Sequence, residues 1–297
     1  SDPEGTALRA KLAGLYGVEA EQVFLSNGSD DILNFAFMAF GADGAVFPAL
    51  TYSFYPVFAN LHGVAYETVP LREDFTLDVA GMQGKGKLTV FPNPNAPTGI
   101  ALPLDQVEAI VAANPDHVVV VDEAYVDFGA DSAVPLLQKY ENLLVVMTYS
   151  KSRSMAGARL GFALGSRALI QDLEKLKYST NPYNVNRLTL KLGQAAVDSD
   201  GYFREKAREI MATREKTAQA LRAMGFTLPD SQANFLFVAH PKVAGETLYR
   251  KCKEKGVLIR HFSDPAIAAY NRVTIGTPAE MEAFLAVVQT ILKEEGA

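Results

Sequence analysis

Residues 118–125 read Val-Val-Val-Val-Asp-Glu-Ala-Tyr, an apolar run that ends abruptly in two acids. A second run of the same kind, Leu-Leu-Val-Val, occupies residues 143–146. Both runs are apolar at successive positions, which is typical of strands covered by helices on both faces. The two runs therefore predict the centre of a largely parallel sheet.

Strand-like runs alternate with helical patterns on either side of this centre. We expect further strands at 23–25, 45–47, 65–69, 88–91 and 160–164, and helices at 30–40, 53–61 and 104–113. Alternation of this kind indicates an α/β fold with a mostly parallel central sheet flanked by helices.

The pattern changes after Asn184. Two long helices are expected within 184–223, followed by strands at 235–238, 257–260 and 272–275 and helices at about 242–254 and 278–293. We therefore predict a large α/β domain with an N-terminal helix over residues 1–215 and a smaller α+β domain over residues 216–297.

The composition is that of a globular enzyme and disfavours several other classes. The 297 residues are 48% hydrophobic and 21% charged, with a formal net charge of −6. An acidic chain is a poor match for nucleic acid or an anionic membrane surface, and no apolar run has the length of a membrane span. No secretory leader is visible, so we expect a cytoplasmic protein.

Cys252 is the only cysteine, which rules out an internal disulfide and fits a reducing compartment. Because it lies in the charged run Lys-Cys-Lys-Glu, we expect it on an exposed helix surface. The four histidines are scattered without metal-ligand spacing, so no metal site is expected.

Three side chains of complementary chemistry lie around the predicted sheet centre. Asp122 ends the first apolar run, Lys151 follows the second, and Arg159 comes eight positions later. The carboxyl ends of strands are where ligands bind in open α/β sheets. Pyridoxal phosphate needs this set: an amine for its aldehyde, a carboxylate to keep its pyridine nitrogen protonated, and a cation for its phosphate.

Two further features suit the same cofactor. The segment Ser26-Asn27-Gly28-Ser29-Asp30 leaves a strand and opens a helix, so the free N–H groups of Ser29 and Asp30 are expected to point at a phosphate. Tyr52 lies beside a helix start, where its ring can stack on the pyridine.

The ordered set of motifs resembles a known family. Asn-Pro-Asn-Ala-Pro-Thr-Gly at 93–99, Asp-Glu-Ala-Tyr at 122–125, and Ser150-Lys151 with Arg159 resemble, in order and spacing, the fold-type-I pyridoxal-phosphate-dependent aminotransferases. The likeness is strongest to the histidinol-phosphate aminotransferases. It extends over nearly the whole chain, including residues 182–186 and 271–277.

The resemblance implies a role for each matched residue. Lys151 would bind the cofactor as a Schiff base and then serve as general base and acid. Asp122 would pair with the pyridine nitrogen, and Tyr125 would hydrogen-bond the ring hydroxyl. The residues expected around the phosphate are Gly28, Ser29, Asp30, Thr148, Ser150 and Arg159.

The implied reaction converts L-histidinol phosphate and 2-oxoglutarate into imidazole-acetol phosphate and L-glutamate, within histidine biosynthesis. Arg260 and Arg272 would bind the anionic groups of these amino-acid and oxo-acid substrates, because guanidinium groups suit phosphate and carboxylate. The family also implies a homodimer.

One position departs from the family pattern. The family usually has Asn where this chain has Ala96, and that asparagine supports the ring hydroxyl. We expect Tyr125 to take more of this contact, with Asn93 or Asn95 as candidates to compensate.

Other readings stay open at this point. An aromatic or broad-specificity aminotransferase, or a threonine-phosphate decarboxylase, would share these residues. A ligand-sensing transcriptional regulator would need a basic DNA-binding segment, and none is visible.

The segment 81–87 matches most of a nucleotide-binding loop, but Leu88 follows its lysine and the segment enters a strand instead of a helix. Tyr52 and Tyr55 lie near several Phe residues, for which core packing is the default interpretation.

Overall fold

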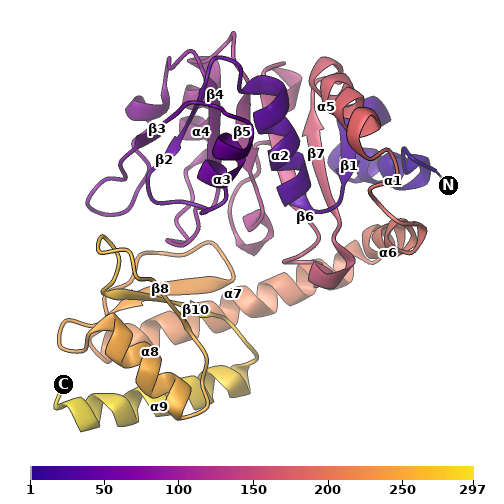
Figure 1. Ribbon diagram of the computed structural model, residues 1–297. Helices are drawn as coiled ribbons and strands as arrows, with labels where there is room; N and C mark the ends of the chain where they lie inside the picture. Colours follow the sequence, from indigo (N-terminus) through magenta and orange to yellow (C-terminus); the bar gives the residue numbers. More distant parts are fainter. Residues whose placement is uncertain (1) are drawn as a thin grey trace.

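The computed structural model describes residues 2–297, which form two sheets with helices around each (Figure 1). The larger sheet has seven strands in the order β1-β7-β6-β5-β4-β2-β3. Their bounds are Val23–Ser26 (β1), Ala45–Pro48 (β2), Tyr66–Val69 (β3), Leu88–Pro92 (β4), Val119–Asp122 (β5), Leu143–Thr148 (β6) and Gly161–Gly165 (β7). Six of these strands run in one direction and β7 runs opposite to them, between β1 and β6. The predicted α/β fold with a mostly parallel sheet is therefore confirmed.

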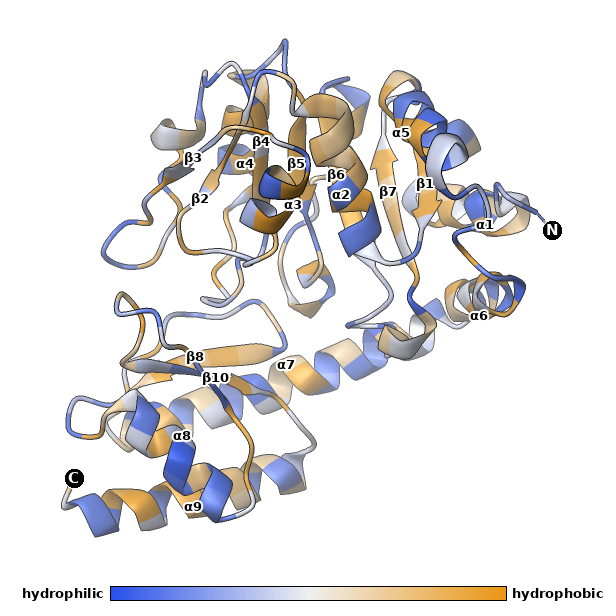
Figure 2. Ribbon diagram, viewed as in Figure 1, coloured by the Kyte–Doolittle hydropathy of each residue, from blue (hydrophilic) through white to orange (hydrophobic). Residues whose placement is uncertain are grey.

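The central strands are buried on both faces, as their unbroken apolar runs predict. In β5, Val119 and Val121 belong to one hydrophobic cluster while Val120 belongs to the cluster on the opposite face. The three valines have no exposed surface. Burial of each contributes roughly 1.5–3 kcal/mol relative to an exposed position. Figure 2 shows these strands as the apolar centre of the large sheet.

Helices complete the two outer layers. One face is covered by α2 (Ser29–Phe40), α3 (Tyr55–Leu61) and α5 (Arg167–Thr180), and the other by α1 (Thr6–Tyr16), α4 (Leu104–Ala112) and α6 (Arg187–Asp198). Helix α5 has no counterpart among the expected helices, because charged residues outnumber its buried apolar ones.

The smaller sheet is antiparallel, in the order β8-β10-β9. Its strands are Phe235–Ala239 (β8), Arg260–His261 (β9) and Tyr270–Thr274 (β10), and it is backed by α8 (Gly245–Glu254) and α9 (Pro278–Glu295). Strand β9 thus begins where the expected strand at 257–260 ends. Figure 1 shows β8 and β10 on the side of α8 and α9 that faces the large sheet.

The expectation of an exposed Cys252 is wrong. Its side chain is fully buried in the core of the smaller sheet, together with Leu248 one helical turn earlier. Lys251 and Lys253 lie about 100° to either side of Cys252 on an amphipathic helix, and Lys251 pairs with Glu294 of α9, so charged neighbours in sequence do not predict exposure.

The long helix α7 (Asp200–Ala223) joins the two parts. Near its start, Phe203 packs against the large core, and near its end Leu221 lies in the small core. Between them, Arg214 donates hydrogen bonds of 2.8 Å to the carbonyl oxygens of Phe128 and Ala233. Among residues 2–297, no helix is long and apolar enough to cross a membrane.

Candidate active site

The carboxyl ends of β4, β5 and β6 open into a cavity of about 150 Å³. Its lining includes nearly every residue that was predicted to contact the cofactor: Ser29, Asp30, Tyr52, Asp122, Tyr125, Thr148, Ser150, Lys151 and Arg159. Gly28 lies directly behind this lining, next to the guanidinium of Arg159. The fold therefore brings together side chains that are up to 130 positions apart in the sequence.

Asp122 is the last residue of β5, and its side chain is buried at the base of this cavity. Its Oδ2 accepts a hydrogen bond from the Tyr55 hydroxyl at 2.9 Å, and its Oδ1 accepts one from the Ala124 backbone N–H at 3.2 Å. Burial raises the pKa of Asp122 to about 6, although both hydrogen bonds act to lower it. Each oxygen retains a lone pair for a further donor.

Lys151 follows β6 and is exposed to the open cavity. Its Nζ lies 5.3 Å from the centroid of the Tyr125 ring. That ring packs edge-on against Phe235 of the smaller sheet, with 5.0 Å between ring centroids. The Lys151 amine is therefore accessible to a ligand. Tyr125, through its contact with Phe235, connects the cavity wall near this amine to β8 of the smaller sheet.

The turn that opens α2 is shaped by two glycines. Gly28 has φ 89°, a backbone conformation that favours glycine, and a Cβ there would lie 2.7 Å from Nη2 of Arg159. On the other side, a Cβ on Gly161 would lie 2.5 Å from the backbone nitrogen of Ser29. The turn thus fits closely between Arg159 and β7, and the first residues of α2, Ser29 and Asp30, line the cavity.

Asp30 connects two other walls of the cavity. Its carboxylate accepts a 2.8 Å hydrogen bond from the Tyr52 hydroxyl and forms a 3.3 Å ion pair with Arg159. Burial and the Asp30 carboxylate raise the pKa of Tyr52, so its hydroxyl remains a donor.

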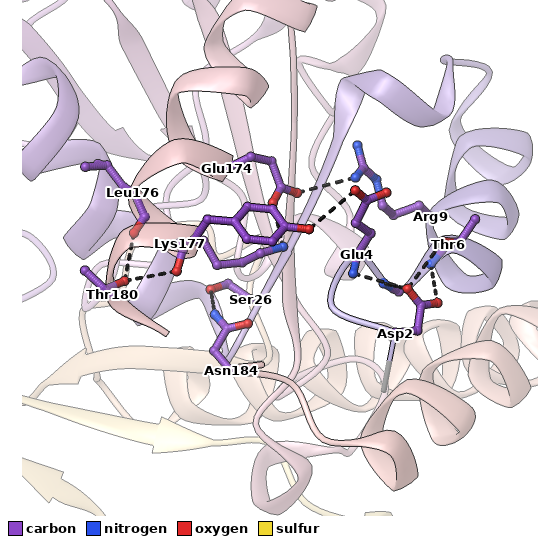
Figure 3. A network of polar contacts seen from close by, with 12 residues as sticks. Asp2, Glu4, Thr6, Arg9, Ser26, Glu174, Leu176, Lys177, Thr180 and Asn184 are labelled. Carbon is purple, nitrogen blue, oxygen red and sulfur yellow. Dashed lines mark hydrogen bonds and ion pairs between the residues drawn. The ribbon is translucent and has the colours of Figure 1, made fainter. Parts of the chain in front are cut away.

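A clamp that the sequence did not reveal holds this turn from outside. The side-chain amide of Asn184 donates to Ser26 Oγ at 2.7 Å (Figure 3). It also donates to Asp31 Oδ2 at 2.8 Å, and Ser26 donates to Asp31 as well. Asn184 lies between α5 and α6, within the string at 182–186 that contributes to the family likeness. That string was the available signal for its role.

Ala96 lines the cavity, whereas the two nearby asparagines do not. Asn93 is hydrogen-bonded through both ends of its amide to the backbone of Leu102. The Asn95 amide bonds to Thr51, Thr98 and the Leu50 carbonyl. Both amides are thus already hydrogen-bonded within the protein and lie outside the cavity lining, whereas Tyr125 packs beside Ala96 and lines the cavity.

Arg260 and Arg272 face one another across β9 and β10 as directly opposed residues of an antiparallel pair. Opposed residues project from the same face of a sheet. The Arg272 guanidinium lies 5.2 Å from the Phe235 ring, which itself contacts Tyr125. Two cations therefore lie on the face of the smaller sheet that carries Phe235.

The segment 81–87 has no nucleotide-loop geometry. Its start overlaps a short turn of 3₁₀ helix, Ala80–Met82, and it then leads into β4. Both of its lysines lie near the carboxylate of Glu67 at the sheet edge.

Pyridoxal phosphate fits the donors of the cavity. The buried carboxylate of Asp122 has lone pairs available for a ring N–H, and the Lys151 amine is accessible. The Arg159 cation and the free N–H groups of α2 lie together at one end, as a phosphate requires.

Comparison with known proteins agrees with this geometry. Residues 2–288 match the family model described as aminotransferase class I and II. The chain is 49% identical to histidinol-phosphate aminotransferase 1 of Bordetella parapertussis over 98% of its own length and 83% of that protein. It is 45% identical to the histidinol-phosphate aminotransferase of Brachyspira hyodysenteriae, with the same two coverages.

Solved structures share the fold. The histidinol-phosphate aminotransferase of Clostridium acetobutylicum superposes with a TM-score of 0.90 at 20% identity, covering 99% of this chain and 90% of that one. The enzyme of Sinorhizobium meliloti, solved with pyridoxal-5'-phosphate, gives 0.88 at 23% identity, covering 99% and 83%. The chain belongs to the class I and II aminotransferases, the family of fold-type-I pyridoxal-phosphate-dependent transaminases.

Proposed function

We propose that this transaminase exchanges the amino group between L-histidinol phosphate and 2-oxoglutarate, forming imidazole-acetol phosphate and L-glutamate in histidine biosynthesis. One observation carries the proposal: Asp122, Lys151 and Arg159 surround a single cavity. The curated relatives at 42–49% identity support the choice of substrate. A threonine-phosphate decarboxylase shares the fold at 21% identity, which supports no choice of substrate.

The residues that line the cavity would each bind a different part of the cofactor. Asp122 would keep the pyridine nitrogen protonated, Tyr52 would stack on the ring, and Tyr125 would hold the ring hydroxyl. The phosphate would be bound by Arg159 together with Gly28, Ser29, Asp30, Thr148 and Ser150. When bound, pyridoxal phosphate supplies an electron sink for the negative charge that deprotonation leaves at the substrate Cα.

Lys151 would hold the cofactor aldehyde before the substrate amine replaces it. Its free amine would then take the proton from the substrate Cα and return it one position further on. Arg260 and Arg272 would bind the substrate phosphate and carboxylate. The position of Arg272 beside Phe235, with Arg260 directly opposite it on β9, supports this.

The organisation of the whole molecule is part of the proposal. We infer a cofactor-binding domain over residues 1–215 and a small domain over 216–297, with α7 joining them. The protein would act as a homodimer, as the resemblance implies, and in the cytoplasm, as its single cysteine favours.

The test uses Lys151→Ala with the exposed Lys175→Ala as control. After borohydride reduction and dialysis, wild type and Lys175→Ala should retain a cofactor-derived label on Lys151, and Lys151→Ala should retain none. A label on another lysine would refute the assignment. Assays with histidinol phosphate, phenylalanine, tyrosine and threonine phosphate then decide the substrate: kcat/KM should be highest for histidinol phosphate.

A further inference from the structure

Tyr55 is a buried hydroxyl directed at the base of the cavity but outside its lining. It is the first residue of α3, has no exposed surface, and packs against Phe47 and Tyr52 with ring centroids 5.8 and 5.7 Å away. Core packing accounts for the ring alone. It does not account for a hydroxyl in an apolar core, which is costly unless it is hydrogen-bonded.

The hydroxyl is bonded to the functional carboxylate. Tyr55 Oη lies 2.9 Å from Asp122 Oδ2, while the Ala124 N–H binds the other oxygen. One donor comes from α3 and the other from the chain just after β5. Together they fix the plane of the carboxylate, since each oxygen is held from a different element.

We propose that Tyr55 is a positioning residue, whose hydroxyl holds the Asp122 carboxylate oriented and ready for the ring nitrogen of the cofactor. This rests on the proposed function of Asp122. Burial and the Asp122 charge raise the pKa of Tyr55 well above its ordinary value, so the hydroxyl is a donor at every working pH. A permanent donor favours the ionised carboxylate, which the ring nitrogen needs.

Other charged groups around Asp122 act in opposite directions. The Asp30 carboxylate on α2 raises the pKa of Asp122, and the Lys151 amine lowers it. The titratable groups around Asp122 also include its neighbours Tyr52 and Glu123. After the opposing effect of burial, the Tyr55 hydrogen bond has the largest influence on the pKa of Asp122, so its removal should be measurable over this background.

The direct test is Tyr55→Phe, which removes the hydroxyl and keeps the ring. Carbon-13 NMR of labelled Asp carboxyls in the full cofactor-free chain follows Asp122, with Asp122→Asn identifying its resonance. We expect the pKa of Asp122 to rise by about one pH unit in Tyr55→Phe, since a hydrogen bond to a charged group has this strength. An unchanged pKa would overturn the proposal.

Tyr149→Phe is the matched control. Tyr149 is also buried, and its hydroxyl has no hydrogen-bond partner among residues 2–297. This variant should leave the pKa of Asp122 unchanged. An equal shift in both variants would mean that loss of any buried hydroxyl causes it, and would overturn the proposal.

A kinetic cycle separates this proposal from that for Asp122. Tyr55→Phe should lower kcat about tenfold with little change in KM, because the hydroxyl does not touch the substrate. In the Asp122→Asn background the same substitution should have no further effect; an equal fall there would show that Tyr55 does not act through Asp122. If Asp122→Asn alone leaves kcat and the cofactor absorbance unchanged, the proposed role of Asp122 fails. If Asp122→Asn is impaired but Tyr55→Phe is normal, only the role of Tyr55 fails.

Discussion

The Arg159 guanidinium lies 3.3 Å from the Asp30 carboxylate at the mouth of the cavity, with their side chains 45% and 42% exposed. An ion pair this exposed contributes little to folding stability. It instead holds the arginine beside the first N–H groups of α2. In the proposed function, the pair therefore serves to organise the phosphate site more than to stabilise the fold.

Replacing Arg159 by Ala should weaken pyridoxal phosphate binding about 100-fold, because a charge-assisted contact to phosphate is worth about 2–3 kcal/mol. Absorbance titration of cofactor-free protein measures this. Pyridoxal, which lacks the phosphate, should bind wild type and variant equally. Arg167→Ala removes an exposed ion pair with Glu19 and serves as the control. If Arg159→Ala lost as much affinity for pyridoxal as for pyridoxal phosphate, Arg159 would not act through the phosphate.

Replacing Gly161 by Ala should displace the turn that opens α2. The new Cβ would lie 2.5 Å from the backbone of both Gly28 and Ser29, and backbone atoms cannot rotate away. We expect at least a tenfold loss of cofactor affinity, about 1.4 kcal/mol. Gly14→Ala, on the open surface of α1, should keep full affinity and raise the free energy of unfolding by about 0.5–1 kcal/mol. Normal cofactor binding by Gly161→Ala would contradict the close fit of the turn.

The buried pair of Lys177 and Glu174 should respond asymmetrically to mutation. The Lys177 side chain is 1% exposed and lies 2.6 Å from Glu174, which also pairs with Arg9 (Figure 3). Lys177→Met should change the free energy of unfolding by no more than about 1 kcal/mol, since Glu174 keeps Arg9. Glu174→Gln should cost about 3 kcal/mol, because it leaves a buried cation unpaired. Urea unfolding gives the free energy of unfolding of both variants. A larger loss of stability in Lys177→Met than in Glu174→Gln would refute this prediction.

Glu123 should make stability depend on pH. Burial raises its pKa to about 8 from an ordinary value of 4.5, against the hydrogen bonds from Ser132 and Ala133. Between these values the folded chain holds a proton that the unfolded chain has released. The free energy of unfolding should therefore fall as pH rises from about 5 to 8, by at most about 1.4 kcal/mol per pH unit.

Glu123→Gln should flatten that slope, and the exposed Glu141→Gln should not. Thermal or urea unfolding at several pH values gives the difference between the variants. Parallel slopes for wild type and Glu123→Gln would mean that Glu123 is ionised throughout this range.

The sheet was predictable because its strands are buried on both faces. The runs Val118–Val121 and Leu143–Met147 can be recognised as strands from their own sequence, without knowing which strands they pair with. The functional side chains near their carboxyl ends are then expected to lie together, because parallel strands end at the same edge of the sheet. Asp122, Lys151 and Arg159 were accordingly predicted together. Helix α5 was not, because Leu169, Ile170 and Leu173 are its main apolar signal among charged residues.

Residues that act through another residue were not predictable in this way. Tyr55 lies among Phe47, Tyr52 and Phe58, so its sequence context predicts only packing; the contact with Asp122 arises when α3 folds over the end of β5. Lys177 has the sequence of an exposed lysine but is buried by the packing of α5 on β1. Such contacts join segments 67 or more positions apart, beyond the reach of local periodicity.

Helix α7 has a consequence for how the molecule unfolds. Phe203 and Leu221 are on one continuous rod of 24 residues, about 36 Å long, and each belongs to a different core. Melting either core releases one end of the rod and, with it, the Arg214 bonds to Phe128 and Ala233. Cooperativity is therefore transmitted along the helix, and a calorimeter should record one endotherm for both sheets.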